Sequence, residues 1–168
     1  MKTTLYMAMT VNGFIAKEDD ETPWSEEEWR SFAGFVEQSR NLIIGRKTYE
    51  LMREANQFEK IGNPFAVVLS GSEEEVKEGF VFVKSPSDAL KALEEKGFDC
   101  ALIGGGALTN TVFIKQGLID EIILDIEPMI FGKGITLFAG EDFETRLEFI
   151  EMKKLSGNTI QLRYRVKR

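Results

Sequence analysis

Residues 100–116, CALIGGGALTNTVFIKQ, contain the change of pattern that decides the fold class of this chain. The apolar run 100–103 predicts a buried strand, and the triplet Gly104-Gly105-Gly106 predicts a tight turn. The segment that follows predicts a helix to about Gln116, which Gly117 ends. A strand, a glycine turn and a helix in this order are typical of a parallel α/β sheet.

The same order recurs on both sides of this stretch. The expected strands cover residues 4–9, 14–16, 42–44, 65–69, 80–83 and 121–126, and the expected helices start at Ser25, after Gly45 and at Ser85. Residues 146–166 alternate in hydrophobicity and predict an antiparallel hairpin that turns at Gly157-Asn158. The sequence therefore predicts a three-layer α/β fold: a mostly parallel central sheet, flanking helices and a C-terminal antiparallel hairpin.

The composition excludes several classes of function. The chain has 168 residues, no histidine and a formal net charge of −7. Without histidine, neither a Ser-His-Asp or Cys-His catalytic group nor a histidine metal site can form, and we expect no metal. The negative charge argues against nucleic-acid binding, because contacts to phosphates need a basic face.

Length and patterning predict a single domain over residues 1–168, because no repeat, linker or low-complexity segment interrupts the chain. No apolar run approaches the roughly 20 residues that span a bilayer, so we expect no membrane contact. Residues 1–6 lack the apolar run of a signal peptide, and the single cysteine, Cys100, cannot form an internal disulfide. These features predict a cytoplasmic protein.

Three expected strands end in small, hydroxylic or basic residues, where α/β sheets bind their ligands. These ends are Gly45-Arg46-Lys47-Thr48, Ser70-Gly71-Ser72 and Gly104-Gly105-Gly106. A basic pair at a helix start opposes the helix dipole, whereas a phosphate bound there would explain the pair. Lys84 follows a further strand and could join the same site. The alternatives are exposed cations on a surface turn and a glycine turn that serves packing alone.

Glu28 is the carboxylate that the sequence singles out. It lies in the first turn of an expected helix, four residues before Phe32, and could hold an amidine-like heterocycle through paired hydrogen bonds. It also completes the capping-box pattern Ser-x-x-Glu with Ser25. Asp125, inside an apolar run, either faces solvent or lines the pocket as a second carboxylate. Met7 and Met52 could contact a flat ligand or belong to the core.

Several of these segments together resemble the dihydrofolate reductase superfamily, which includes the reductase domain of riboflavin biosynthesis. They are residues 8–16 (AMTVNGFIA), Pro23-Trp24, 44–50 (IGRKTYE), Leu69-Ser70, 83–85 (VKS) and 103–108 (IGGGAL). The resemblance runs nearly end to end. Residues 117–138 look especially like the riboflavin-type branch.

The resemblance implies NADPH as hydride donor and a small heterocycle as acceptor. Ala8 and Ile15 would flank the nicotinamide, and the glycine triplet would hold the pyrophosphate. The residues implied in cofactor binding are Ala8, Ile15, Gly45, Arg46, Lys47, Thr48, Leu69, Ser70, Gly71, Lys84, Ile103, Gly104, Gly105, Gly106, Ala107, Leu108 and Thr109. The resemblance places Glu28 and Phe32 at the substrate, with Glu28 also catalytic, and Met7, Met52 and Asp125 complete the residues expected to bind the substrate.

The resemblance leaves the substrate open. Reduction of 7,8-dihydrofolate to tetrahydrofolate is the first reaction implied, and reduction of 5-amino-6-(5-phosphoribosylamino)uracil in riboflavin biosynthesis is the alternative. A non-catalytic NADP-binding module is a further alternative. The arginine that the dihydrofolate enzymes place before the strand ending in Leu69-Ser70 is absent from residues 62–65, and Phe14 replaces a lysine typical of the riboflavin branch. That branch tends to pair through its sheet, which implies a possible homodimer.

Overall fold

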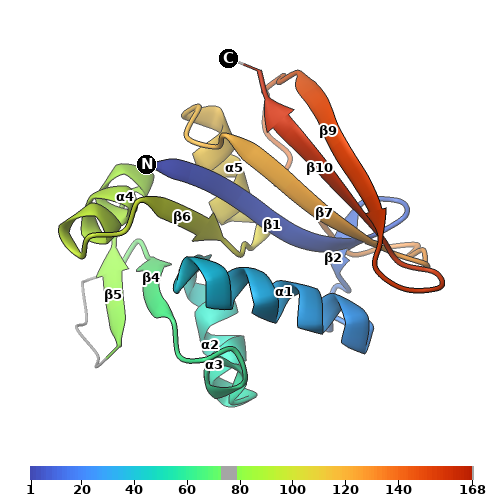
Figure 1. The fold of residues 1–168 in the computed structure, drawn as a ribbon, viewed down its shortest axis with the longest axis horizontal. Coiled ribbons are helices and arrows are strands. Elements are labelled where there is room, and N and C mark those ends of the chain that lie inside the picture. Colours follow the sequence, from blue (N-terminus) through green and yellow to red (C-terminus); the bar gives the residue numbers. More distant parts are fainter. Residues whose placement is uncertain (73–78, 168) are drawn as a thin grey trace.

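An eight-stranded sheet runs through the protein in the order β5-β4-β3-β6-β1-β7-β10-β9 (Figure 1). The computed structural model describes residues 1–72 and 79–167. The first six strands of this order are parallel: β5 (Phe80–Val83), β4 (Phe65–Leu69), β3 (Asn41–Gly45), β6 (Cys100–Ile103), β1 (Lys2–Thr10) and β7 (Glu121–Glu127). β10 (Ile160–Val166) and β9 (Leu147–Lys154) continue the sheet antiparallel. The prediction of a mostly parallel sheet with a terminal antiparallel hairpin is confirmed.

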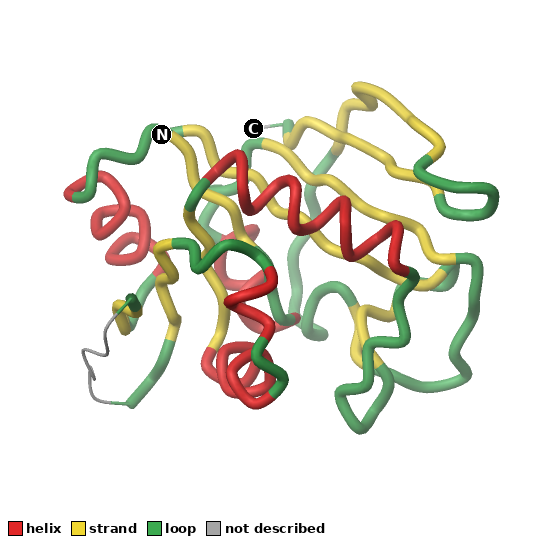
Figure 2. Tube along the Cα trace, turned by 60° about the horizontal axis from the view of Figure 1, so that its bottom comes forward, coloured by secondary structure: helices red, strands yellow, loops and turns green. Residues whose placement is uncertain are grey.

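Helices cover both faces of this sheet. α1 (Glu26–Ser39), α2 (Arg46–Glu54) and α3 (Gln57–Lys60) lie on one face, and Figure 2 shows α1 crossing the strands there. The buried side chains of that face include Tyr6, Val36 and Met52. α4 (Pro86–Glu95) and α5 (Ala107–Lys115) lie on the other face, over a core that includes Leu5 and Phe113. Because strand side chains alternate between faces, the neighbours Leu5 and Tyr6 belong to different cores.

The direction of chain winding reverses between β3 and β6. From β3 the chain continues through α2 and α3 to β4 on one side, and from β6 it continues through α5 to β7 on the other side. Ligands of α/β sheets bind at the carboxyl ends of strands at such a reversal. The two strand ends are joined there, because the Gly45 N–H donates to the Gly105 carbonyl over 2.8 Å.

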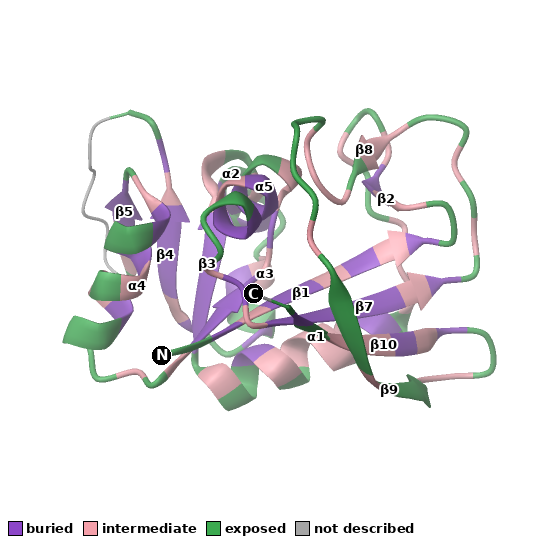
Figure 3. Cartoon of the chain, turned by 90° about the horizontal axis from the view of Figure 1, so that it is seen from above, coloured by how far each residue is buried: buried purple, intermediate pink, exposed green. Residues whose placement is uncertain are grey.

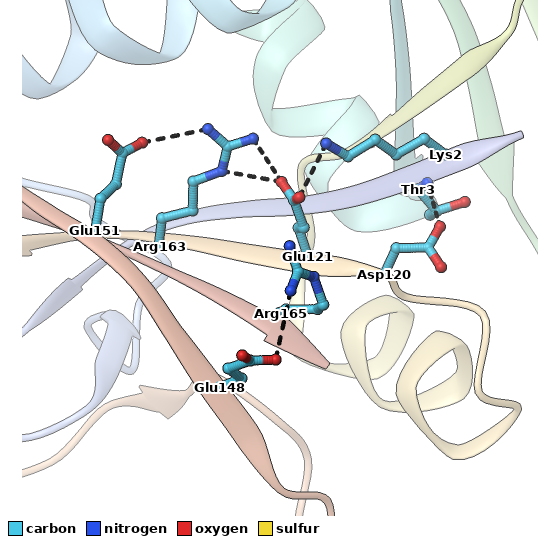
Figure 4. A network of polar contacts seen from close by, with 8 residues as sticks. All are labelled: Lys2, Thr3, Asp120, Glu121, Glu148, Glu151, Arg163 and Arg165. Carbon is cyan, nitrogen blue, oxygen red and sulfur yellow. Dashed lines mark hydrogen bonds and ion pairs between the residues drawn. The ribbon is translucent and has the colours of Figure 1, made fainter. Parts of the chain in front are cut away.

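An ion-pair network fastens the hairpin to the parallel strands (Figure 4). The Glu121 carboxylate on β7 accepts hydrogen bonds from Arg163 on β10 over 2.9 and 2.6 Å, and Lys2 on β1 lies 2.9 Å from it. Arg163 also pairs with Glu151 on β9 at 3.2 Å. Burial opposes ionisation of Glu121, but the hydrogen bonds from Lys2 and Arg163 outweigh it and lower its pKa. The ionised Glu121 carboxylate therefore links β1, β7 and β10, and Arg163 extends the network to β9 through Glu151.

The sequence did not predict two short elements. α3 has 4 residues, and β8 (Ile135–Thr136) has 2 residues and pairs antiparallel with β2 (Phe14–Ala16). Elements of this length show no periodicity that a sequence pattern can reveal. Within residues 1–72 and 79–167, every helix is too short or too polar to cross a bilayer.

Candidate active site

The three strand ends that the sequence suggested for anion binding lie side by side. The Arg46 guanidinium donates to the Ser72 hydroxyl over 3.3 Å, and Ser72 lies 2.8 Å from the Ser70 hydroxyl. Gly45, which precedes Arg46, bonds to Gly105 in the glycine triplet. Arg46, Ser70 and Gly105 therefore belong to one surface at the carboxyl ends of β3, β4 and β6, which we call the strand-end surface.

Two helices begin at this surface without a side-chain cap. The N-cap residues of α2 and α5 are Gly45 and Gly106, which have no side chain to accept the first helical N–H groups. By contrast, α1 and α4 begin at Ser25 and Ser85, whose hydroxyls accept such a hydrogen bond. The unsatisfied donors and the dipoles of two neighbouring helix starts favour an anion.

Close packing also requires the glycines of this surface. A Cβ on Gly45 would lie 2.6 Å from the Thr109 hydroxyl, and one on Gly104 would lie 2.8 Å from Leu42. Gly105 has a φ of +94°, and its Cβ would lie 2.9 Å from the Met7 sulfur. The packing explanation that the sequence left open therefore holds. It does not explain the uncapped amides, which remain the stronger evidence for a ligand.

The cations of the strand-end surface pair with two carboxylates, the exposed Glu50 and the half-buried Asp20. Arg46 pairs with Glu50 at 2.9 Å and stacks over the Phe82 ring, and Lys47 pairs with Asp20 at 2.7 Å. An exposed pair such as Arg46–Glu50 contributes only about 0–1 kcal/mol, so a bound phosphate can replace Glu50 at little cost. Lys84 follows β5 and is exposed.

A second part of the site is acidic and buried beneath α1. Glu28 is 4% exposed, and its Oε1 lies 3.4 Å from the hydroxyl of Tyr6 on β1. The same hydroxyl donates to Oδ2 of Asp125 on β7, which is fully buried. Gln161 on β10 donates to Oδ1 of Asp125 over 2.6 Å. We call Tyr6, Glu28, Asp125 and Gln161 the buried acid cluster.

The capping-box interpretation of Glu28 is half right. The Ser25 hydroxyl accepts the Glu28 N–H over 3.2 Å, as predicted. The pattern also predicts that the Glu28 carboxylate accepts the Ser25 N–H. This prediction is wrong, because Oε2 of Glu127 accepts that N–H over 2.9 Å. Glu127 is 1% exposed, and its other oxygen accepts hydrogen bonds from the hydroxyls of Ser25 and Thr159. A carboxylate of β7 thus completes the cap, and the Glu28 carboxyl turns toward the sheet.

Burial and neighbouring acids change the ionisation of this cluster. Burial raises the pKa of Glu28 to about 8, and the charges of Asp125 and Glu127 act in the same direction against the hydrogen bond from Tyr6. Burial also raises the pKa of Asp125, which hydrogen bonds from Tyr6 and Gln161 oppose. The pKa of the Tyr6 hydroxyl rises through burial and through the charges of Glu28 and Asp125. At neutral pH, Glu28 therefore carries a proton.

The family model described as the RibD C-terminal domain matches residues 1–161. The chain belongs to this family. YwjB of Bacillus subtilis, named as an uncharacterized protein, is 32% identical over 170 residues, which cover 97% of each chain.

Two solved structures place the family within a wider fold. A crystal structure from Shewanella sp. PV-4, named for riboflavin biosynthesis, is 23% identical, covers 100% of both chains and has a TM-score of 0.82. Dihydrofolate reductase of Enterococcus faecalis, solved with NADP(H), is 20% identical, covers 99% of this chain and 97% of that one, and has a TM-score of 0.73. The predicted resemblance and the dihydrofolate reductase-like fold are confirmed.

In this RibD C-terminal domain, most residues predicted for the substrate lie on the α1 face. Phe32 packs on Tyr6 with ring centroids 5.5 Å apart, and Met52 belongs to the same core. Asp125 lies inside the buried acid cluster, so the solvent-facing alternative is wrong. Met7 lies on the opposite face, against Gly105, because it follows Tyr6 on a strand. The sheet therefore separates Met7 from Glu28, contrary to their expected grouping.

The remaining residues predicted for the cofactor lie along the strand-end surface, on β1 and on β2. Ala8 and Ile15 are buried on β1 and β2, and the side chain of Ile103 is fully buried in the core. Leu69 pairs in register with Gly45, and Leu108 in the first turn of α5 is 71% exposed. Three further residues predicted for the cofactor lie at the same strand ends and are partly buried or exposed: Thr48, Gly71 and Ala107.

An unsatisfied acceptor beside the glycine triplet fits a ligand with hydrogen-bond donors. Among the residues that the structure describes, the buried Oδ1 of Asn110 has no hydrogen-bond partner. It lies 3.8 Å from the position of a Cβ on Gly105. Together with the two uncapped helix starts and the nearby cations, it gives a donor and acceptor set suited to a phosphorylated dinucleotide. Within the described part of the chain, no group of three acidic, Cys or His residues is placed to hold a metal.

Sequence reasoning missed Tyr6, Gln161 and Glu127. The sequence does contain a signal for Glu127. Asp125 and Glu127 lie two residues apart and therefore on one face of the expected strand. Two acids on a buried face require hydrogen-bond donors nearby. Tyr6 and Gln161 supply donors to Asp125 only because β1 and β10 flank β7, with Gln161 opposite Asp125. No pattern within either strand indicates that pairing.

Proposed function

We propose that this chain is an NADPH-dependent reductase that transfers hydride to a pterin or a related pyrimidine heterocycle. The observation that carries the proposal is the contact of β1 with both parts of the site. Tyr6 reaches the buried acid cluster, and the next residue, Met7, packs against the glycine triplet. Adjacent residues of β1 therefore contact the buried acid cluster on one face of the sheet and the glycine triplet on the other.

The strand-end surface is the proposed NADPH site. Residues 104–108 would hold the pyrophosphate, residues 46–48 would hold phosphates, and Ser70 and Lys84 would lie near the 2′-phosphate. Ala8 and Ile15 would flank the nicotinamide, which supplies a hydride when the cofactor is bound. The likeness in fold to a reductase solved with NADP(H) supports this assignment.

Glu28 is the proposed substrate and acid residue. Its carboxyl group would form paired hydrogen bonds with the amino-pyrimidine edge of the heterocycle. Because burial keeps it protonated at neutral pH, it can also supply a proton to a ring nitrogen. Phe32 packs on Tyr6, whose hydroxyl lies 3.4 Å from Glu28, and on Trp29, so aromatic rings adjoin the buried acid cluster.

The substrate class includes dihydrofolate and 5-amino-6-(5-phosphoribosylamino)uracil. Membership of the RibD C-terminal domain family favours the uracil compound. The absence of an arginine from residues 62–65 agrees with a substrate that lacks a glutamate tail.

The test is NADPH oxidation by the purified chain, followed by absorbance with each substrate in turn. We expect saturable NADPH binding by calorimetry and oxidation that depends on one of the two heterocycles. Absence of NADPH binding would contradict the proposal. Binding without turnover of either compound would instead favour a non-catalytic NADP-binding module.

We also propose that two copies pair through β9. This edge strand is exposed along its length (Figure 3), and Phe149 and Met152 on it are 59% and 62% exposed. Light scattering after size exclusion tests the pairing, and Phe149→Lys should give a monomer if β9 is the interface.

A further inference from the structure

A continuous row of polar groups leads away from Glu28 through the protein interior. The Tyr6 hydroxyl lies between Oε1 of Glu28 and Oδ2 of Asp125, and it is the shared neighbour of the two acids. Nε2 of Gln161 donates to the Ser31 hydroxyl on α1 over 3.1 Å, and hydrogen bonding from Ser31 acts to lower the pKa of Asp125. Tyr6, Glu28 and Asp125 are each at most 4% exposed, so water does not reach these groups freely.

The outer end of this row opens into a groove between α1 and the hairpin. The groove has a volume of about 480 Å³, and its lining includes Ser31, Arg30, Phe35, Lys153 and Leu155. Ser31 therefore has a neighbour at each side: solvent in the groove and Asp125 in the interior. Lys153 of the groove stabilises the charge of Asp125 electrostatically. This opening is separate from the strand-end surface, which lies at the carboxyl ends of β3, β4 and β6.

We propose that Tyr6 and Asp125 are positioning residues that return a proton to Glu28 from the groove at Ser31. The inference rests on the proposed function, in which Glu28 gives its proton to a bound heterocycle. The Tyr6 O–H bond then breaks as a new O–H bond forms on Oε1 of Glu28. For this the ionised carboxylate of Asp125, which is 0% exposed, first takes a proton from a hydronium ion of the groove by way of the Ser31 hydroxyl. Asp125 then gives this proton to the Tyr6 oxygen as the original Tyr6 proton moves to Glu28, which leaves Asp125 ionised and Tyr6 neutral again. One proton enters for each proton consumed, and no electrons move along this row.

The other groups that face Glu28 do not offer an equivalent route. Glu127 on β7 is already occupied by Ser25 and Thr159, which donate three hydrogen bonds to it. Gln161 on β10 is an amide that holds Asp125 and carries no acidic proton. Tyr6 is the group of β1 in contact with Glu28, and it is the group that also reaches Asp125.

Two substitutions should move the pH profile in opposite directions. Tyr6→Phe removes the hydrogen bond that lowers the pKa of Glu28, so the basic limb of kcat should move to higher pH. Asp125→Asn removes the charge that raises this pKa, so the limb should move to lower pH. Both variants should reduce kcat about 10-fold or more, because general acid catalysis typically contributes at least that much. NADPH affinity should stay at the wild-type value in both.

Tyr49→Phe is the matched control. Tyr49 on α2 is also a tyrosine that is 2% exposed, and its hydroxyl accepts a hydrogen bond from Arg53. This variant should keep the wild-type kcat and pH profile. A purely structural role for Tyr6 would change stability in both tyrosine variants and leave both pH profiles in place.

The outcomes separate this inference from the proposed function. A wild-type chain that neither binds nor oxidises NADPH contradicts the proposed function. If the wild type is active and Tyr6→Phe has the same kcat and pH profile as Tyr49→Phe, the proposed return of a proton through Tyr6 and Asp125 is overturned. If Tyr6→Phe does not fold, kcat of Asp125→Asn at its own pH optimum decides, because a loss of about 10-fold or more supports the return of a proton through Asp125 and a wild-type kcat overturns it.

Discussion

The first turns of α1 and α2 satisfy their backbone donors in opposite ways. α1 begins with the acids Glu26, Glu27 and Glu28 behind a serine cap, which agrees with the direction of the helix dipole. α2 begins with Arg46 and Lys47 behind a glycine, which opposes the dipole and leaves the donors uncapped. A helix start completed by its own chain can hold a side chain such as Glu28 in place. A helix start left incomplete is suited to bind an anion from outside.

Glu28→Gln tests the acidic side of this comparison and should have the largest effect. The amide cannot supply a proton, so kcat should fall by about 10²- to 10⁴-fold, the usual contribution of a general acid. NADPH affinity should be unchanged, because the cofactor is proposed to bind at the strand-end surface. Steady-state kinetics and calorimetry measure the two quantities. Glu26→Gln, on an exposed position of the same turn, is the control and should keep the wild-type rate. A wild-type kcat in the Glu28→Gln variant would remove Glu28 from the chemistry.

The pH dependence of stability tests the same carboxyl without any substrate. The pKa of Glu28 is about 8 in the folded chain and 4.5 in its reference state, so the folded state binds the proton more tightly between these values. Stability should therefore fall as pH rises from about 4.5 to about 8. Urea unfolding of the wild type and of Glu28→Gln across this range measures the effect. The free energy of unfolding of the variant relative to wild type should increase with pH. A constant difference would mean that Glu28 is ionised in both states.

Gly105→Ala tests how tightly the backbone of the strand-end surface is packed. The substitution places a Cβ at a φ of +94° and 2.9 Å from the Met7 sulfur. Left-handed strain of about 1–2 kcal/mol and overpacking of about 1–3 kcal/mol should together lower the free energy of unfolding by about 2–5 kcal/mol. Gly117→Ala is the matched control, because Gly117 also has a positive φ, +66°, but nothing lies within 4 Å of its Cβ. Denaturant unfolding should show the smaller loss for the control. Equal losses would mean that Met7 moves aside without cost.

Arg46→Gln tests the charge at the same surface. A hydrogen bond to a charged group contributes about 1.5–3 kcal/mol, so the Kd for NADPH should rise about 10-fold or more. The rise should shrink at high salt, because the phosphate and the guanidinium are screened. Lys91→Gln is the control, since Lys91 pairs with Glu95 one turn away on α4, as Arg46 pairs with Glu50 on α2. If both variants bind NADPH like the wild type, Arg46 serves only its ion pair with Glu50.

The difference between the two regions also explains what the sequence could predict. The strand-end surface follows from local patterns, because apolar strands that end in Gly45-Arg46 and in Gly104-Gly105-Gly106 are visible in the chain. Parallel strands bring their carboxyl ends to one edge, so the grouping of Arg46, Ser70 and Gly105 could be expected before the structure was known.

The buried acid cluster could be predicted only in part. Glu28 stands out by its place in a helical turn, but its partners come from β1, β7 and β10, which are far apart in the chain. The capping-box pattern indicated the wrong partner for the Glu28 side chain, because the donor that it would satisfy is taken by Glu127, 102 residues from Ser25. The order of strands in the sheet places Glu127 beside Ser25, and this tertiary contact overrides the local capping-box preference.

Ser25→Ala and Ser85→Ala separate capping from support of the site, with the smallest expected effect. Both hydroxyls accept the N–H three residues on, from Glu28 over 3.2 Å and from Asp88 over 3.1 Å, so each loss should cost about 1 kcal/mol of unfolding free energy. The Ser25 hydroxyl also donates to Glu127, which is 1% exposed, whereas Ser85 donates to the exposed Asp88. Leaving a buried acceptor short of a donor adds about 1 kcal/mol or more to the Ser25 variant alone. Urea unfolding should show this difference, and kinetics should show a lower kcat only for Ser25→Ala. Equal costs with equal rates would mean that the cap of α1, like that of α4, serves the helix and leaves Glu28 unaffected.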